Sequence, residues 1–454
     1  MDARAVLGVT PPSPKRPRNE ETPPPADSNG ADRLSDLPEG VLHHLLSLLP
    51  AHEAVRTCVL ARRWRHLWMS APGLVVTEIN GFRSAEKLDL FVTRLLLLHR
   101  SGDGGDARLE SCQFSLCGFY FEFDGFLPAS APHLTRWILT ALQRQVKALR
   151  VSLGDFEEDF QLPHQPLSSH NLTTLDLDNV DTNDSVLDFS GCPALLNLKM
   201  SFAHVNAHRI ASQSLKHLIM KYCGFYAEER TRISLPSLVS LELIDPMGRA
   251  PLLESMPALQ TATFLFNYDC TDICSDRIGR FDACGRSMCE GCYYNYEPVD
   301  DHNDSLLLKG LSEATELNLE AIPDVYVFMR DLKWCPTFTK LKTLVLGEWC
   351  LAADLDALIL FLRHSPILEK LTLHVPPLEE VRKNSMEVEK IYNPLEQLVA
   401  SSLLQMVTIK CQEVDGMVLR LLKMLNASGV PFDRIIIQCE NRRSCDGCKF
   451  TIGQ

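Results

Sequence analysis

The stretch Leu215-Lys-His-Leu-Ile-Met-Lys-Tyr-Cys-Gly-Phe225 carries the pattern that decides the fold of this chain. Large apolar residues stand at Leu215, Leu218 and Met220, and the last two are separated by one residue, as the inward-facing residues of a β-strand are. A unit of this size buries its leucines only against neighbouring units of the same kind. The stretch therefore predicts further copies of itself along the chain.

Copies of this L-x-x-L-x-L pattern recur through the sequence. The first six start 26, 23, 20, 23 and 21 residues apart, which is the period of leucine-rich repeats. In such repeats the x-L-x-L part is a strand, and a following turn and helix close the coil. We therefore expect an α/β fold whose body is an irregular leucine-rich-repeat solenoid. The triplets are Val146-Leu149-Val151, Leu172-Leu175-Leu177, Leu195-Leu198-Met200, Leu215-Leu218-Met220, Leu238-Leu241-Leu243, Leu259-Ala262-Phe264, Ala314-Leu317-Leu319, Leu341-Leu344-Leu346, Leu368-Leu371-Leu373 and Leu404-Val407-Ile409.

The position after the strand varies between copies. It usually holds Asn or Cys, and here Cys223 and Asn267 fit, whereas Pro246, Trp349 and Pro376 do not. We therefore expect uneven curvature and loop length. The leucines are interpreted as core, and binding is expected from the strand edges and loops between them.

The pattern changes to a helical one near the N-terminus, where three short helices are predicted. Asp36 and Glu39 fit a capping box for the first, which Pro50 ends. A second is expected from Ala51, and a third over residues 59–69.

Three stretches of this segment carry a resemblance. They are Leu37-Pro-Glu-Gly-Val-Leu42, Leu45-Leu-Ser-Leu-Leu-Pro50 and Val55-Arg-Thr-Cys-Val-Leu-Ala-Arg-Arg-Trp-Arg-His-Leu-Trp68. They resemble the plant-type F-box, and the departures are small: Ala61 replaces a frequent Ser, and His52 a common Lys or Arg. The resemblance implies docking to the Skp-type adaptor of a cullin-RING ubiquitin ligase. The adaptor-binding residues it implies are Leu37, Pro38, Val41, Leu42, Leu45, Leu46, Leu49, Val55, Val59, Leu60, Trp64, Leu67 and Trp68.

Physical chemistry independently indicates that this segment needs a second surface. About 40 residues bury too little area to fold securely alone, yet these include two tryptophans and many large aliphatics. That surface is either the first coil of the repeats or a separate protein bound through Leu and Trp anchors. The resemblance favours the separate protein.

The layout as a whole is similar to that of plant F-box/LRR proteins with a C-terminal FBD region, a strand, helix and strand. Here that order is expected over 404–409, 417–425 and 433–437. The predicted domains are a disordered Pro-rich tail at 1–31, the F-box at 32–72, a linking segment with first irregular repeats at 73–132, the repeats at 133–400 with a Cys-rich insertion near 268–305, and the FBD-like end at 401–454.

The insertion contains cysteines that are candidate ligands for a metal ion. Cys289 and Cys292 have the C-x2-C spacing that places two thiolates on one Zn²⁺, and Cys270 and Cys274 could supply the other pair. Irregular spacing and an odd number of cysteines argue against zinc, so a metal-free loop is the default and no cofactor is expected. A second C-x2-C motif lies at 445–448.

Charge and composition exclude several classes of function. The net charge of −13 disfavours nucleic acid as a ligand, since phosphate binding relies on Lys and Arg. No apolar run approaches the roughly 20 residues that span a bilayer, and no secretory signal is evident, so no membrane partner is expected. The 16 cysteines are then mostly thiols in a reducing compartment. A basic cluster at Lys15, Arg16 and Arg18 fits a nuclear import signal or an ordinary charge run, so we expect the nucleus and/or the cytoplasm.

No enzyme motif is found: there is no P-loop, G-x-S-x-G or H-E-x-x-H. We therefore expect a non-catalytic substrate receptor of an SCF-type ubiquitin ligase, whose repeats bind an unknown target protein. The alternatives are a non-degradative scaffold, in which the helices only cap the repeats, and a zinc-stabilised interaction module.

Overall fold

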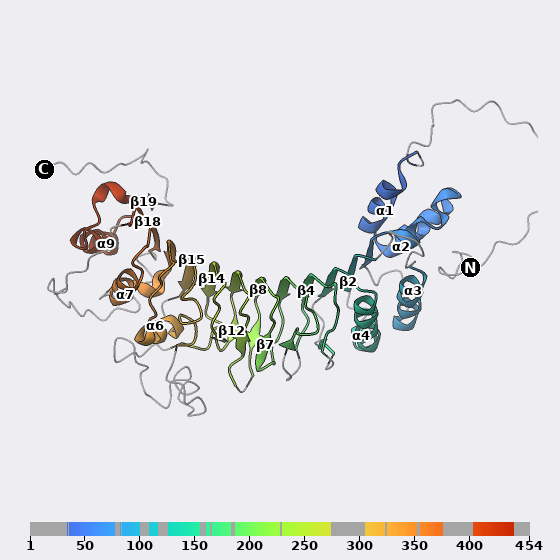
Figure 1. Ribbon diagram of the computed structural model, residues 1–454, viewed down its shortest axis with the longest axis horizontal. Helices are drawn as coiled ribbons and strands as arrows, with labels where there is room; N and C mark the ends of the chain where they lie inside the picture. The colour runs from blue at the N-terminus through green and yellow to red at the C-terminus, as the bar shows by residue number, and fades with distance from the viewer. Residues whose placement is uncertain are drawn as a thin grey trace, which may run out of the picture. The chain divides into compact units, whose positions relative to one another are not determined.

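The computed structural model describes residues 34–439 except 35, 78–81, 83, 100–108, 117–125, 155–159, 164–165, 183–186, 228, 274–304, 323–324, 352–354 and 376–402, and the backbone alone of 126–131. The chain divides into two compact units, one of residues 1–180 with 191–195 and one of 181–190 with 196–454. Figure 1 shows their elements. The predicted tail at 1–31 and its basic cluster lie outside the described residues. None of the described helices combines the length and apolarity needed to cross a membrane.

Both units are built on parallel strands that pair in chain order. The strands of the first unit are β1 (Gly73–Thr77), β2 (Ser111–Leu116), β3 (Ala148–Leu153) and β4 (Thr174–Asp178). Those of the second unit are β6 (Asn197–Ser201), β8 (His217–Lys221), β11 (Ser240–Ile244), β14 (Thr261–Phe266), β15 (Glu316–Ala321), β16 (Thr343–Leu346), β17 (Lys370–His374), β18 (Met406–Cys411) and β19 (Ile435–Cys439).

The predicted triplets lie on or just before these strands and in register. Leu198, Leu218 and Leu241, for example, are paired residues of β6, β8 and β11. Every residue of the ten triplets is at most 2% exposed. The prediction that these leucines form the core is therefore confirmed, because alternate residues of parallel strands point to one side and each coil covers the next.

Two further coils precede the first predicted triplet. Leu74 of β1 pairs with Cys112 of β2, and Cys112 pairs with Leu149 of β3. The corresponding triplets are Ala71-Leu74-Val76 and Leu109-Cys112-Phe114, all buried. They lie in the segment at 73–132, where first irregular repeats were predicted, but no triplets were assigned there because Ala, Cys and Phe fill positions where the pattern expects Leu.

The prediction that a helix closes each coil is wrong for the shortest coils. Repeats that start at Leu195, Leu215 and Leu238 are 20 to 23 residues long, and short strands close them. These are β5 (Leu187–Asp188), β7 (Arg209–Ala211), β10 (Arg232–Ser234) and β13 (Leu252–Leu253), paired side by side, with β9 (Gly224–Phe225) beside β12 (Met247–Gly248). A short return leg is spanned by extended chain, which rises about 3.3 Å per residue against 1.5 Å in a helix.

Longer coils carry the helices. Repeats starting at Ala314 and Leu341 are 27 residues long, and helices occupy their return legs. The helices of the repeats are α3 (Ala85–Leu98), α4 (Phe126–Gln143), α6 (Val327–Asp331), α7 (Asp356–His364) and α9 (Gly416–Ala427), with 3-10 turns η6 (Leu332–Trp334), η7 (Glu348–Cys350) and η8 (Phe432–Arg434). At the C-terminal end, β18, α9 and β19 follow the predicted order of strand, helix and strand.

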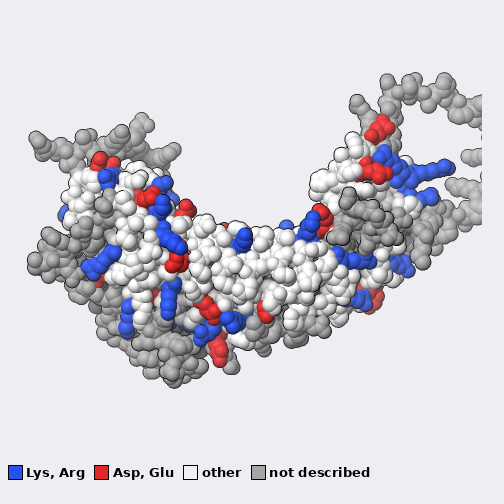
Figure 2. Space-filling model, viewed as in Figure 1, with Lys and Arg blue, Asp and Glu red and all other residues white. Residues whose placement is uncertain are grey.

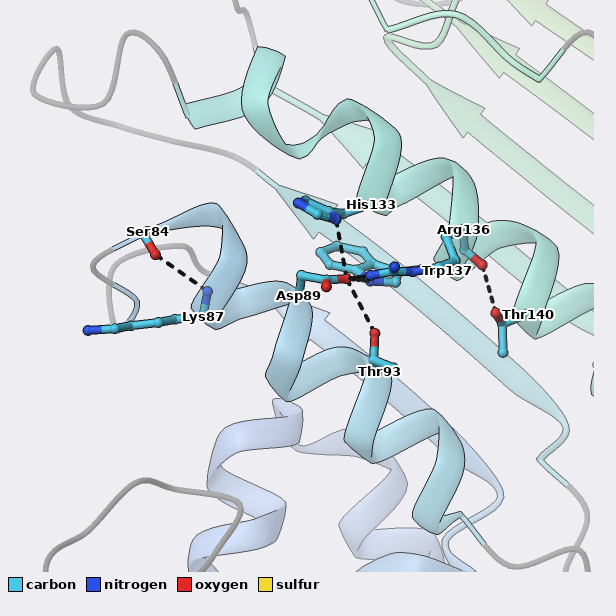
Figure 3. A network of polar contacts seen from close by, with 8 residues as sticks. All are labelled: Ser84, Lys87, Asp89, Thr93, His133, Arg136, Trp137 and Thr140. Atoms are coloured by element: carbon cyan, nitrogen blue, oxygen red, sulfur yellow. Dashed lines mark hydrogen bonds and ion pairs between the residues drawn. The ribbon is translucent and has the colours of Figure 1, made fainter.

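In the first unit, a single carboxylate joins α3 to α4. Asp89 of α3 accepts hydrogen bonds from Arg136 and, at 3.0 Å, from Nε1 of Trp137. His133 Nδ1 lies 3.5 Å from the same carboxylate, and Thr93 donates to it from within α3 (Figure 3). Burial alone would raise the pKa of Asp89, but the hydrogen bonds from Arg136 and Trp137 outweigh it and lower the pKa. The charged form therefore fixes the two helices together.

In the second unit, buried carboxylates hold the chain on both sides of residues 274–304. Asp272 pairs with Arg230, and both side chains are about 95% buried or more. Asp331 accepts the hydroxyl of Ser305 at 2.7 Å, together with three consecutive backbone N–H groups from Leu306 onward. Burial raises the pKa of Asp331 despite these donors. The Cys-rich insertion thus leaves and rejoins the repeats at two polar anchors.

Candidate docking surface on the N-terminal helices

The first helix, α1 (Glu39–Leu48), begins at Pro38. The Pro38 carbonyl accepts the N–H groups of Val41 at 3.0 Å and Leu42 at 3.2 Å, and no side chain caps the helix. The predicted capping box of Asp36 and Glu39 is therefore wrong, because Pro38 itself is the capping residue. Its end is as predicted: the residue before Pro50 is extended, which proline enforces.

One face of α1 is already buried inside the protein. Leu42 and Leu46 are 0% and 1% exposed, and the helix packs on β1 and on η4 (Leu67–Ser70). Packing on β1 is close: a Cβ at Gly73 would lie 2.9 Å from the Cβ of Ser47. The first coil of the repeats therefore receives this face, as one of the two sequence alternatives expected.

The opposite face of α1 is uncovered in the described structure. Val41, Leu45 and Leu48 are 44%, 40% and 64% exposed. Their spacings of four and three residues place them on one side of the helix. We call these three residues the α1 stripe. Exposed apolar side chains in a row are the usual form of a helix surface that binds a partner.

The expected third α-helix over 59–69 is not formed. After α2 (Ala51–Arg56), the chain makes three 3-10 turns, η2 (Thr57–Val59), η3 (Arg63–Arg65) and η4. This path buries Trp64, Leu67 and Trp68, and leaves Val59 and Leu60 74% and 66% exposed. A continuous α-helix would have turned Leu60 toward the same side as Trp64, since residues four apart share a face.

Arginine side chains surround these turns. The Nη2 of Arg63 donates to the Leu37 carbonyl at 2.9 Å, which joins η3 to the residues before α1. Arg62 and Arg65 are exposed, and Figure 2 shows Lys and Arg gathered over the N-terminal helices. Exposed arginines thus lie on the turns that follow α2.

The structure therefore divides the predicted adaptor-binding residues into groups. Leu37 and Leu49 are half-buried, and Pro38 is exposed with Val41, Leu45, Val59 and Leu60. Exposed Leu48 was missed, although it stands three residues after Leu45 and the helical period could have found it. The predicted residues that lie inside the fold are Leu42, Leu46, Val55, Trp64, Leu67 and Trp68.

Of the four candidate zinc ligands, only Cys270 lies within the described residues. It is 1% exposed, and burial raises the pKa of its thiol. Cys274, Cys289 and Cys292 lie outside the described residues, so the zinc alternative is not tested and the metal-free loop stays the expectation. Within the part of the chain that the structure describes, no three His, Cys, Asp or Glu residues gather as metal ligands would.

Two family models match this chain. The F-box domain matches residues 34–74, and the LRR repeats of the FBD-associated F-box protein At5g56370 match residues 123–267. The first match covers α1 through the start of β1, and the second covers α4 through β14. Neither match indicates an enzymatic family.

Similar proteins come from Arabidopsis thaliana. The putative F-box/FBD/LRR-repeat protein At5g44950 is 28% identical over 267 residues, which are 48% of this chain and 58% of that protein. The chain thus spans under three fifths of this relative. The F-box/LRR-repeat protein At3g26922 is 30% identical over 269 residues, 52% of this chain and 82% of that protein. The F-box match covers the N-terminal helices and the repeat match covers parallel strands, and the names of the relatives contain both F-box and LRR repeat. This chain therefore belongs to the family of F-box/LRR-repeat proteins.

Proposed function

We propose that this protein is the substrate receptor of an SCF-type ubiquitin ligase, and that the α1 stripe, with Val59 and Leu60, docks the Skp-type adaptor. F-box domains generally bind such adaptors. The observation that carries the proposal is the division of α1: its inner face is buried against β1 and η4, whereas Val41, Leu45 and Leu48 remain 40% to 64% exposed. Fold stability does not account for that second apolar face.

The energetics support a protein partner for this surface. Complete burial of one Val or Leu side chain contributes roughly 1.5–3 kcal/mol, and such anchors dominate helix-in-groove binding. Several partly exposed aliphatics on one surface thus contribute a large part of the free energy of docking. The exposed side chains of Arg62 and Arg65 would in addition attract acidic groups of a partner.

In this proposal the repeats form a solenoid that holds the target protein, and the chain has no catalytic role of its own. The other subunits of the ligase carry out ubiquitin transfer. The receptor accelerates it by holding the target near the charged ubiquitin carrier, which raises the effective concentration. The proposed sites of action are the nucleus and/or the cytoplasm.

Capture by a purified Skp-type adaptor tests the docking surface. We expect the variant Leu45→Glu/Leu48→Glu to fold and to lose at least about tenfold in affinity, since two charges would enter an apolar groove. Leu97→Glu is the matched control, because Leu97 is 66% exposed on α3, outside the stripe. Equal capture of wild type and the double variant would refute the proposed surface.

A second candidate function is a scaffold in which the N-terminal helices only cap the repeats. The buried inner face of α1, with Leu42 and Leu46 against β1, favours this role. Hydrogen exchange on the chain without adaptor, then with it, separates the two functions. A cap gives the same protection in both, whereas docking adds protection on the α1 stripe.

A further inference from the structure

Three consecutive coils of the second unit end in the same unusual backbone conformation. Phe202 after β6, Tyr222 after β8 and Asp245 after β11 have φ of 51°, 54° and 47°. Backbone bonds place them side by side: Phe202 N–H donates to the Lys221 carbonyl, and Tyr222 N–H to the Ile244 carbonyl, both at 2.9 Å. Neighbouring coils lie about 4.8 Å apart, so these residues form a short row.

Two of the three side chains, those of Phe202 and Tyr222, raise the energy of this backbone conformation. Left-handed backbone suits Gly, Asn and Asp, whereas a bulky side chain with positive φ is an outlier with a cost of roughly 1–3 kcal/mol. Asp245 obeys the rule, and so does Asn179, which follows β4 with φ of 57°. Phe202 and Tyr222 break it, so folding alone would favour other residues there.

The aromatic rings are presented to solvent. Phe202 and Tyr222 stack with centroids 4.8 Å apart and planes 12° from parallel, and they are 56% and 41% exposed. The stacking energy of the two rings offsets part of the energy cost of the left-handed backbone. The fold therefore keeps a stacked aromatic pair on the outside of its repeats.

The charges at the end of the row are acidic. Asp245 follows Tyr222 in the row, and burial together with the neighbouring Asp269 raises the pKa of Asp245. Among the described residues, neither carboxylate has a hydrogen-bond or ion-pair partner for its side chain. Lys221, just before Tyr222, has its Nζ 3.9 Å from Glu242. Arg249 stands four residues after Asp245 and, in the described structure, forms no ion pair with either carboxylate. An aromatic face beside unpaired carboxylates is the arrangement that attracts a cationic group.

We propose that Phe202, Tyr222, Asp245 and Asp269 form a cation-binding shelf that receives a Lys or Arg side chain from a basic segment of the target protein. The outer faces of the stacked rings contact the cationic head, and the carboxylates pair with its N–H groups. That the basic segment belongs to a target protein rests on the function proposed above, but the binding itself does not require the adaptor. Loss of adaptor docking would thus leave this site intact, and loss of this site would leave docking intact.

A binding experiment with a basic peptide tests the shelf. The probe is a fluorescein-labelled Gly-Ser-Arg-Gly-Arg-Ser-Gly peptide, followed by anisotropy on the full chain at about 0.15 M salt, where distant charges are screened. We expect Phe202→Asn/Tyr222→Asn to bind at least about tenfold more weakly. This variant keeps the net charge, and Asn accepts the left-handed backbone, so thermal melting should be unchanged or higher.

Matched variants control for charge and for aromatic loss. Asp245→Asn should weaken binding, whereas Asp433→Asn removes the same charge from an exposed site elsewhere, and Phe432→Asn removes an exposed aromatic there. Both controls should bind as wild type does. Equal binding by wild type and the double aromatic variant would overturn the proposal, and so would an absence of measurable binding. Equal binding of a peptide with Gln in place of both Arg residues would overturn it as well.

Discussion

The guanidinium of Arg230 and the carboxylate of Asp272 form a bidentate pair inside the second unit, with Nη1–Oδ2 and Nη2–Oδ1 distances of 2.8 and 2.5 Å. Arg230 also donates to the Ala250 carbonyl, and Asp272 accepts the Ala250 N–H. The pair joins a residue two positions before β10 to the segment after β14. It therefore fixes the chain where the Cys-rich insertion begins.

Removing one member of this pair should be costly. We expect Arg230→Ala to lower the free energy of unfolding by about 3–5 kcal/mol, because Asp272 would remain charged and buried without its partner. Urea denaturation measures the loss. The double variant Arg230→Met/Asp272→Leu should lose less, since neither member of the pair then remains buried and charged without its partner. A single variant as stable as wild type would contradict this account.

Acidification should destabilise the first unit through His99. Burial, opposed by a hydrogen bond with the Met69 backbone and reinforced by nearby Arg144, lowers the pKa of His99 to about 4 from 6.5. The unfolded chain therefore binds the proton more tightly between these values, so stability falls as pH falls from about 6.5 toward 4. The loss from pH 7 to pH 5 should be about 2 kcal/mol. His99→Leu should flatten this pH dependence of urea denaturation, and an unchanged slope would refute it.

The two faces of α1 should respond differently to truncation in the absence of any partner. Leu46→Ala should lower the free energy of unfolding by about 2–5 kcal/mol, because Leu46 is 1% exposed and its loss leaves a cavity. Leu48→Ala, at 64% exposed, should change it by less than about 0.5 kcal/mol. Thermal melting of both variants provides the check. Similar losses for the two would mean that the outer face is also packed.

Thiol reactivity should separate core cysteines from surface ones. Burial raises the pKa of Cys112 and of Cys223 to about 12, so almost no thiolate exists at neutral pH. We expect iodoacetamide to leave both unmodified in the folded protein and to alkylate exposed Cys439. Peptide mass spectrometry before and after urea treatment reads this out. Rapid alkylation of Cys223 in the native protein would contradict its position in the core.

The repeat pattern alone was enough to predict the strands at the ten triplets and their buried residues. Leu215, Leu218 and Met220 occupy a spacing that only a strand next to copies of itself can bury, so local sequence and tertiary packing agree. The leucine pattern did not identify Cys112 as a core residue, because a buried position accepts any apolar residue of suitable size. Cys meets that condition as well as Leu does.

The resemblance of the N-terminal segment marked it as an F-box, but only the tertiary structure decided which side chains stay exposed. Leu46 and Leu48 are equally apolar in the sequence, and the position of β1 makes one core and the other surface. Only the tertiary structure likewise showed that 3-10 turns replace the third helix, and that these turns bury Trp64 and Trp68 while Leu60 stays exposed. The sequence did not predict the row of Phe202 and Tyr222, because the backbone conformation after a strand depends on how each coil pairs with the next. Sequence periodicity therefore determined the coils, and contacts between coils determined the surfaces available for binding.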